Sequence, residues 1–301
     1  MKIGHGDCRC KRLEAFDLST IHVDLLGTET KFYRTKNFTT RVIEAGEGTP
    51  LILMHGGGGH AETYARNFKN LSKICRPMSI DFIWHGLSSK PAPKSGNWLT
   101  QFTEQVLELL DHIGADKAHF EGESLGGWIA MDMGINHPDR VGKLILNTAW
   151  GVQMPGYFEN ADLASLRESS MNALNNPSYE TIKKRLEWLM PLGGATDELV
   201  DLRRTLWSDP ETREALIGYY DRLFVPELFD YLHSDQDLGK IDVPSLLLWT
   251  DKNPFAGPDE ARRIQGLIKG SELYVMEGAA HWPQWERPQE HDDVVIKFLQ
   301  S

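Results

Sequence analysis

Short apolar runs alternate with amphipathic segments along most of the chain. Seven runs of four or five residues have the character of strands, at residues 41–44, 51–54, 77–80, 118–121, 143–146, 245–249 and 272–276. Short runs of this kind are typical of a sheet that is buried on both faces. Between two of them, Phe102, Val106, Leu109 and Ile113 share one face of a predicted helix. The alternation predicts an α/β fold in which helices cover both sides of a mostly parallel sheet.

This alternation stops between residues 152 and 238. Amphipathic helical segments rich in Trp, Tyr, Met and Leu replace the strands there, and the strand–helix rhythm resumes at Val243-Pro244. We therefore predict a core in two parts, 1–151 and 239–301, with a helical cap inserted at 152–238. The aromatic residues of the cap could line a substrate pocket or pack into the core of the cap; they are Trp188, Trp207, Tyr219, Tyr220, Phe224 and Phe229.

Composition and charge narrow the classes of protein. The 301 residues, 41% of them hydrophobic, suffice for one large core with an insertion. A net charge of −11 without a Lys/Arg cluster argues against a nucleic-acid partner. The N-terminal residues lack the apolar core of a signal peptide, and no run of about eighteen apolar residues could span a bilayer. We expect a cytoplasmic protein with a small-molecule substrate and no membrane partner; the sequence leaves a homo-oligomer open.

The cysteines are Cys8, Cys10 and Cys75, too few and too oddly placed for a disulfide framework. This usage fits a reducing compartment. His5, Cys8 and Cys10 could together hold a metal ion, but no fourth ligand is evident. We therefore expect a frayed N-terminal segment and no metal.

The most informative motif is Gly122-Glu123-Ser124-Leu125-Gly126. It follows the strand-like run at 118–121 and precedes a predicted helix over residues 125–136. Glycines two residues before and after Ser124 allow a crowded backbone to turn sharply and expose the serine. The free N–H groups at the helix N-terminus suit an oxyanion. The motif predicts that Ser124 attacks a carbonyl carbon, the alternative being an ordinary glycine-rich turn.

The order of the candidate residues along the chain supports the prediction that Ser124 is a nucleophile. A serine needs a base and a group that orients the base. His281, in a glycine-containing loop after the run at 272–276, is the predicted base. Asp251, just beyond the run at 245–249, is the predicted acid. Asn253 stands at the offset where an aspartate is more usual, and Asp259 is the alternative carboxylate.

A second glycine-rich run, His55-Gly56-Gly57-Gly58-Gly59-His60, follows the strand-like run at 51–54. Glycines there allow a backbone N–H to approach the reacting oxygen closely. We predict that Gly57 or Gly58 gives one oxyanion donor and that Leu125 gives the other. A dinucleotide site is disfavoured because no G-x-G-x-x-G opens a helix with a suitably placed acid downstream.

These motifs together resemble the meta-cleavage-product hydrolases, the C–C bond hydrolases of aromatic degradation within the α/β-hydrolase superfamily. The matching segments are residues 53–58, Asn67-Phe68, Asn70-Leu71, Asp81, residues 85–88, residues 122–127 and residues 281–286. The resemblance implies a cap, a Ser–His–Asp triad and no metal or organic cofactor. It also implies substrate contacts at Asn67, Glu123 and Trp282. In that family the histidine helps convert a 2-hydroxy-6-oxo-dienoate to its keto form before the carbonyl is attacked.

Two departures bear on the substrate. Glu123 stands where the family usually has a neutral Asn, and the arginine expected in the cap to hold an anionic substrate is not cleanly matched. The candidates are Arg203, Arg204, Arg213 and Arg222, each also typical of a solvated helix face. The sequence thus predicts a C–C hydrolase, with an esterase or lactonase for an apolar substrate as the alternative. A ligand-binding protein on a hydrolase scaffold is a third hypothesis.

Overall fold

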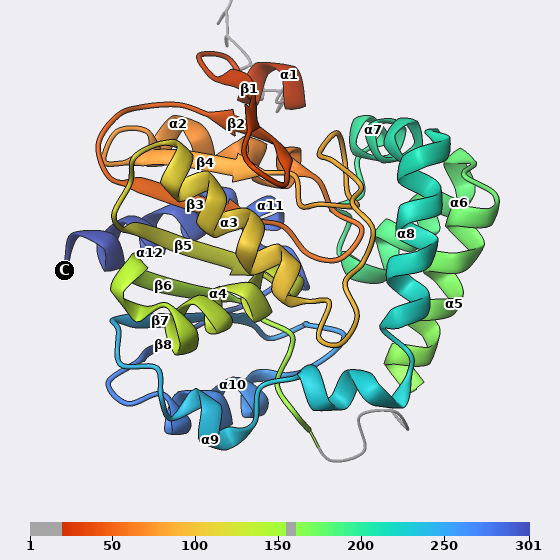
Figure 1. Ribbon diagram of the computed structural model, residues 1–301. Coiled ribbons are helices and arrows are strands. Elements are labelled where there is room, and N and C mark those ends of the chain that lie inside the picture. Colours follow the sequence, from red (N-terminus) through yellow and green to blue (C-terminus); the bar gives the residue numbers. More distant parts are fainter. Residues whose placement is uncertain (1–19, 155–160) are drawn as a thin grey trace, which may run out of the picture.

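A central sheet of eight strands organises the molecule, shown as a computed structural model that describes residues 20–154 and 161–301 (Figure 1). The strand order is β1-β2-β4-β3-β5-β6-β7-β8. At one edge of the sheet, β2 pairs antiparallel with both β1 and β4. The strands β4, β3, β5, β6, β7 and β8 run parallel to one another. The strands are β1 (Glu29–Arg34), β2 (Thr39–Glu44), β3 (Pro50–Met54), β4 (Arg76–Ile80), β5 (Ala118–Glu123), β6 (Val141–Asn147), β7 (Ser245–Thr250) and β8 (Glu272–Met276).

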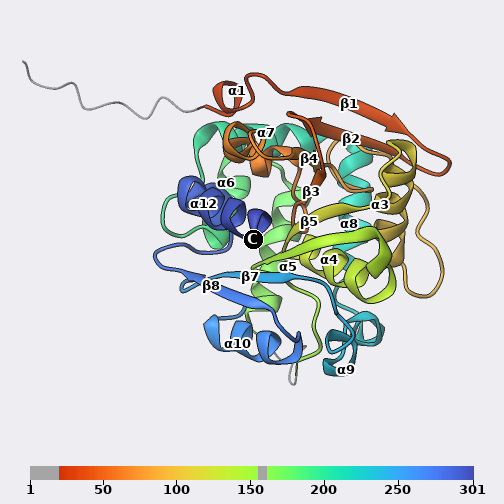
Figure 2. The same ribbon diagram turned by 90° about the vertical axis from the view of Figure 1, so that its left-hand side faces the viewer.

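The central strands of the sheet are buried on both faces, which is why they carry apolar runs. Successive side chains of a strand point to opposite faces. In β3, Ile52 and Met54 join the cluster that includes α3 (Thr100–His112) and α4 (Leu125–Asn136). Leu51 and Leu53 join the cluster under α12 (Pro288–Gln300). Figure 2 shows α12 on one side of the sheet and α3 and α4 on the other. The predicted α/β fold with a mostly parallel sheet is confirmed.

Between β6 and β7, the described residues from 161 to 238 are mostly helical. The helices are α5 (Ala161–Asn175), α6 (Tyr179–Leu189), α7 (Asp197–Ser208), α8 (Pro210–Arg222), the 3₁₀ helix η4 (Pro226–Tyr231) and α9 (Asp235–Leu238). Side-chain caps fix where three of these helices begin, because Ser178, Thr196 and Asp209 accept the otherwise free N–H groups of α6, α7 and α8. Helices α5 to α8 form a separate layer beyond one end of the sheet (Figure 1). We call this layer the cap.

The remaining helices connect or flank the strands. They are α1 (Ile21–Asp24), η1 (Ala61–Asn67), α2 (Phe68–Leu71), η2 (Pro138–Arg140), α10 (Pro258–Leu267) and α11 (Pro283–Glu286). Among the described residues no helix is both long and apolar enough to cross a membrane. The described residues also hold no group of three side chains that could bind a metal ion, and His5, Cys8 and Cys10 lie outside the described residues.

Candidate active site

Ser124 lies at the sharp turn between β5 and α4. Its backbone φ of 51° is a left-handed conformation that a residue with a side chain rarely adopts. The turn closes because glycines flank it: a Cβ on Gly122 would lie 2.0 Å from the Gly126 carbonyl oxygen, and one on Gly126 would lie 2.3 Å from the Met54 carbonyl oxygen. The carbonyl of Ser124 accepts N–H bonds from the first turn of α4 and from Trp150. These contacts hold Ser124 at the carboxyl end of the sheet.

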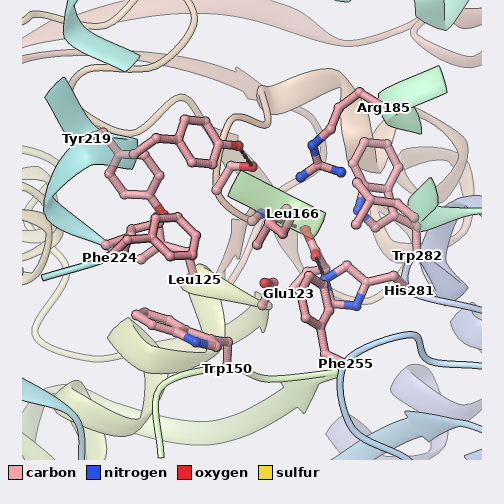
Figure 3. Close-up of a pocket in the computed structure, with 16 residues that line it drawn as sticks. Glu123, Leu125, Trp150, Leu166, Arg185, Tyr219, Phe224, Phe255, His281 and Trp282 are labelled. Carbon is pink, nitrogen blue, oxygen red and sulfur yellow. Dashed lines mark hydrogen bonds and ion pairs between the residues drawn. The ribbon is translucent and has the colours of Figure 1, made fainter. Parts of the chain in front are cut away.

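A cavity that is partly open to solvent lies between Ser124 and the cap. Figure 3 shows side chains from both the core and the cap around it. Its polar and glycine lining is Gly56, Gly57, Glu123, Ser124, Arg185 and His281, with the hydroxyl-bearing Tyr219 and Tyr220. Its apolar lining is Leu125, Trp150, Leu166, Leu189, Leu223, Phe224, Phe255 and Trp282. Of the cap aromatics, Tyr219, Tyr220 and Phe224 therefore reach the cavity.

His281 is buried in this cavity, and its ring is held from the Nδ1 side by Asn253. Nδ1 lies 3.0 Å from Asn253 Oδ1. The same oxygen accepts the backbone N–H of Phe255 at 3.3 Å, so the carbonyl end of the Asn253 amide faces the ring. The Nδ1 nitrogen must then carry a proton and donate it to Asn253. This tautomer leaves Nε2 as the nitrogen available for chemistry.

Asp251 does not contact His281, so the predicted partner of the base was wrong. Its carboxylate accepts the N–H of Gly278 at 2.8 Å and pairs with Lys252 at 3.0 Å. Strand β7 continues to Thr250, so Asp251 starts the turn and holds the neighbouring loop, while Asn253 lies deep enough in the turn to reach the imidazole. The alternative, Asp259, is fully exposed and pairs with Arg262 at 2.6 Å.

Glu123 occupies the other side of the imidazole. It is the last residue of β5 and is fully buried. Its Oε1 lies 3.1 Å from His281 Nε2, and its Oε2 accepts the N–H of Gly56 at 2.6 Å. Figure 3 marks the pair formed by Glu123 and His281. Glu123, predicted as a substrate contact, thus lines the cavity but also lies against the imidazole of His281.

The glycine-rich run lies next to Ser124, as expected for an oxyanion site. Gly57 and Leu125 both line the cavity, whereas Gly58 is outside its lining and accepts Trp207 Nε1–H through its carbonyl at 3.2 Å. Leu125 is the first residue of α4, where helix geometry leaves N–H groups without an intrahelical acceptor. Of the two glycines left open by the sequence, the geometry favours Gly57.

The two remaining predicted substrate contacts have different outcomes. Trp282 lines the cavity. Asn67 does not: its amide donates to Asp292 Oδ1 at 2.8 Å and to the Gln284 carbonyl at 3.1 Å, within a buried network behind the site. Asn67 therefore fixes the packing of α11 and α12 against η1, and the expectation that it contacts substrate is corrected.

Two buried arginines stand beside the cavity. Arg203 of α7 is fully buried, and none of its three side-chain nitrogens has a hydrogen-bond partner among the described residues. Its guanidinium lies 5.0 Å from the ring centre of Trp282. Arg185 of α6 lines the cavity, with Nε bonded to Ser170 at 2.8 Å and one terminal nitrogen unpaired within the described structure. Figure 3 shows Arg185 directed from the cap toward the cavity.

Burial of Arg203 away from water lowers the pKa of its guanidinium to about 9, and the neighbouring positive charge of Arg185 acts in the same direction. The group remains charged at neutral pH. Of the other candidates from the sequence, Arg204 forms a salt bridge with Asp201 at 3.0 Å and Arg222 donates to the Gly218 carbonyl at 2.7 Å, both on the helix surface.

Comparison with known proteins gives a consistent picture. A family model described as the alpha/beta hydrolase fold matches residues 49–288. A 2-hydroxy-6-oxo-6-phenylhexa-2,4-dienoate hydrolase of Comamonas testosteroni is 26% identical over 88% of this chain and 92% of its own length. A 2-hydroxy-6-oxononadienedioate/2-hydroxy-6-oxononatrienedioate hydrolase of Burkholderia vietnamiensis is 28% identical over 83% and 86%. The solved 2-hydroxy-6-oxo-6-phenylhexa-2,4-dienoate hydrolase of Rhodococcus sp. strain RHA1 superposes with a TM-score of 0.80 at 21% identity, covering 91% and 99%.

Proposed function

Because the chain belongs to the α/β-hydrolase fold family, we propose that it is a serine hydrolase that cleaves a C–C bond in an anionic 2-hydroxy-6-oxo-dienoate. The relatives named above carry this activity in their names. The observation that carries the proposal is the pair of buried, incompletely bonded arginines beside the serine cavity. A buried cation without a partner is costly, and a substrate carboxylate would compensate it.

In this proposal each residue of the site has a role. Ser124 attacks the carbonyl carbon, and its proton passes to Nε2 of His281, whose tautomer Asn253 maintains. The N–H groups of Gly57 and Leu125 stabilise the oxyanion. The C–C bond then breaks, and the departing carbon takes the proton from Nε2. Water repeats the cycle to release the second product from Ser124.

The arginines orient the substrate during these steps. Arg185 lines the cavity and binds the carboxylate end, while Arg203, buried behind Trp282, attracts the same end by its charge and leaves the reacting carbonyl over Ser124. The group on the far side of that carbonyl lies along an apolar wall formed by Leu166, Leu223 and Phe224. A bound dienoate would thus lie with its charged end at the cap arginines and its apolar end along the cap wall.

The apolar wall also favours a second candidate, an esterase or lactonase. The two candidates share Ser124 and His281 and differ in the use they make of the arginines. A neutral ester needs neither guanidinium, whereas a dienoate needs at least one.

The test is the absorbance of a 2-hydroxy-6-oxo-dienoate mixed with the purified protein, beside a short-chain aryl ester, a lactone and the Ser124→Ala variant. We expect loss of the dienoate to fall by roughly a thousandfold or more in Ser124→Ala, since triad members act as a unit. Turnover of the ester or lactone alone would establish the second candidate. Saturable dienoate binding without turnover by the wild-type protein would indicate a ligand-binding protein.

A further inference from the structure

The run of four glycines after β3, residues 56–59, needs outside support to keep one conformation. Glycine has no side chain to pack and loses more backbone freedom on folding than any other residue. Gly58 also has a backbone φ of 73°, in the left-handed region. An oxyanion donor is most effective when its position is fixed before the charge develops. The bonds that hold this run therefore decide how well it can serve as an oxyanion site.

The first part of the run is held by the core. The carbonyl of Gly56 accepts the Nδ1–H of His55 at 2.7 Å and the N–H of Gly59 at 3.0 Å. His55 Nε2 accepts the N–H of Phe82 at 3.2 Å, so the proton of this ring lies on Nδ1. A trans peptide is planar, with its N–H opposite its C=O. Because the Gly56 carbonyl is held, the direction of the Gly57 N–H is held as well.

The second part of the run is held by the cap. Tyr220 of α8 donates its hydroxyl to the Gly57 carbonyl at 3.2 Å. Trp207 of α7 donates its Nε1–H to the Gly58 carbonyl at 3.2 Å, and both aromatic side chains are buried. A Cβ on Gly58 would lie 2.6 Å from Tyr220 Oη and 2.8 Å from Trp207 Cζ2. The cap thus packs directly on the backbone of the run, which leaves no room for a side chain at position 58.

One peptide unit connects the cap to the Gly57 N–H. The Gly58 carbonyl, which accepts the indole N–H of Trp207, and the Gly59 N–H belong to the same planar unit. That Gly59 N–H is the group that donates to the Gly56 carbonyl. The Gly56 carbonyl in turn sets the direction of the Gly57 N–H. A change in the indole contact would therefore pass through two peptide units to Gly57, which lines the cavity.

We propose that Trp207 and Tyr220 are positioning residues through which the cap holds the Gly57 N–H in place for the oxyanion. Trp207 acts on the peptide that supports Gly57, and Tyr220 acts on the peptide that follows it. The N–H of Gly56 cannot replace this donor without losing its bond to Glu123 Oε2 at 2.6 Å. An ester and a dienoate both form an oxyanion, so the inference rests on the serine hydrolysis in the proposed function and not on the choice of substrate.

The test uses Tyr220→Phe and Trp207→Phe, which each remove one hydrogen-bond donor and keep an aromatic ring. Labelling of Ser124 by a fluorophosphonate, whose phosphoryl oxygen enters the oxyanion site, needs no substrate. We expect each variant to lower the labelling rate and kcat roughly tenfold and the double variant roughly a hundredfold, the lower end of the range for loss of an oxyanion donor. The control is Tyr179→Phe, which removes a cap hydroxyl that bonds Asp197 at the surface and should match the wild type.

Ground-state binding separates positioning from a direct contact with the substrate. Tyr220 also lines the cavity, so a direct contact is the alternative role of its hydroxyl. A ground-state carbonyl does not carry the oxyanion charge. In a Ser124→Ala background, Tyr220→Phe should therefore leave unchanged the Kd for the dienoate or ester that the wild type turns over. A weaker Kd in this background, with kcat of the Tyr220→Phe enzyme unchanged, would assign Tyr220 to substrate contact and overturn the proposal.

Folding and substrate choice are controlled separately. Trp207→Phe shrinks a buried side chain, so Tyr220→Phe, which removes a single oxygen atom, carries the test if the tryptophan variant does not fold. Normal labelling and normal kcat in folded Tyr220→Phe would overturn the proposal. An equal fall in Tyr179→Phe would attribute the effect to looser cap packing and also overturn it. If the wild type turns over no dienoate, the proposed substrate fails, and the labelling rates still decide the role of the cap.

Discussion

Replacing Arg203 by Met should make the protein more stable and less active. Arg203 and Arg204 are neighbours on α7, so Arg204→Met is a matched control. Arg203 is fully buried and unpaired in the described structure, whereas Arg204 lies on the surface and pairs with Asp201. A binding role for Arg203 and a surface role for Arg204 therefore predict different changes in both stability and activity.

The stability change follows from burial. A fall in the Arg203 pKa from 12.5 to about 9 corresponds to several kcal/mol of lost charge stabilisation, at about 1.4 kcal/mol for each pH unit. Methionine removes that cost and keeps apolar contact with Trp282 and Trp207, although some cation–π attraction is lost. Replacing a buried charge with a hydrophobic side chain of similar size is neutral or stabilising by about 1–4 kcal/mol. Arg204→Met should stay within about 0.5 kcal/mol.

The activity change follows from the proposed attraction between the Arg203 charge and the substrate carboxylate. Two unit charges roughly 6–10 Å apart at an effective dielectric constant of about 20 attract by about 1.5–3 kcal/mol. At about 1.4 kcal/mol for each tenfold change, Arg203→Met should lower kcat/KM for a dienoate roughly 10- to 150-fold. For a neutral aryl ester the change should stay within about threefold.

Urea unfolding and steady-state kinetics of the two variants provide the assay. A loss of stability of about 2 kcal/mol or more in Arg203→Met would show that the guanidinium holds the cap together. Equal losses of kcat/KM on the dienoate and the ester would show that it does not recognise an anion. Either result would refute the reasoning.

The buried network behind the site and the serine turn give two more predictions. Burial alone would lower the pKa of His291, but Glu121 and Asp292 outweigh it and raise the pKa to about 10. The folded protein then binds a proton that the unfolded chain releases near pH 6.5, so the free energy of unfolding should fall as pH rises from 6.5 toward 10, by at most about 1.4 kcal/mol per pH unit. Urea unfolding at pH 7 and 9 should show this slope, and a His291→Gln variant with the same slope would exclude His291 as its source. Gly122→Ala places a methyl group 2.0 Å from the Gly126 oxygen and should leave little folded protein in a circular dichroism melt, whereas near-normal melting would mean that the turn can relax.

The serine turn could be predicted from the sequence because its geometry depends on adjacent residues. Gly122, Ser124 and Gly126 lie within five positions, and the clash that excludes larger side chains is local. The core strands were equally accessible, since burial on both faces produces continuous apolar runs. Strand β1 could not be predicted in this way, because its side chains are mostly exposed. It is held in place by pairing with β2, which includes a salt bridge between Lys31 and Glu44 at 2.5 Å.

The partner of His281 depended on the conformation of one turn. Asp251 and Asn253 differ by two positions, and only the length of β7 and the turn after it decide which reaches the ring. Neither the end of β7 nor the conformation of the following turn can be predicted from the local sequence pattern to within two residues. Asn253 lies at the usual offset from the strand, but the acid of a triad is expected to be a carboxylate, and Asp251 was therefore predicted. The approach of Glu123 to His281 joins residues 158 positions apart, so the sequence carries no local signal for it.

The buried arginines did have a signal in the sequence. Arg185 is in phase with Ile182, Leu186 and Leu189, which are buried on one face of α6. Arg203 is in phase with Leu199, Val200 and Trp207 on α7 in the same way. A charged residue in the apolar stripe of a helix is costly unless it has a partner. That periodicity identifies Arg185 and Arg203 as exceptions, whereas Arg204 falls on the solvated face.

The charges around the cavity define the substrate that would balance them. Arg185, in the cavity lining, and Arg203, behind Trp282, bring two incompletely bonded positive charges to the neighbourhood of Ser124. A dienolate carries two negative charges, one on its carboxylate and one on its enol oxygen. A neutral ester supplies none, and a simple monocarboxylate supplies one. The two arginines would therefore be balanced better by a dianion than by a monocarboxylate or a neutral ester.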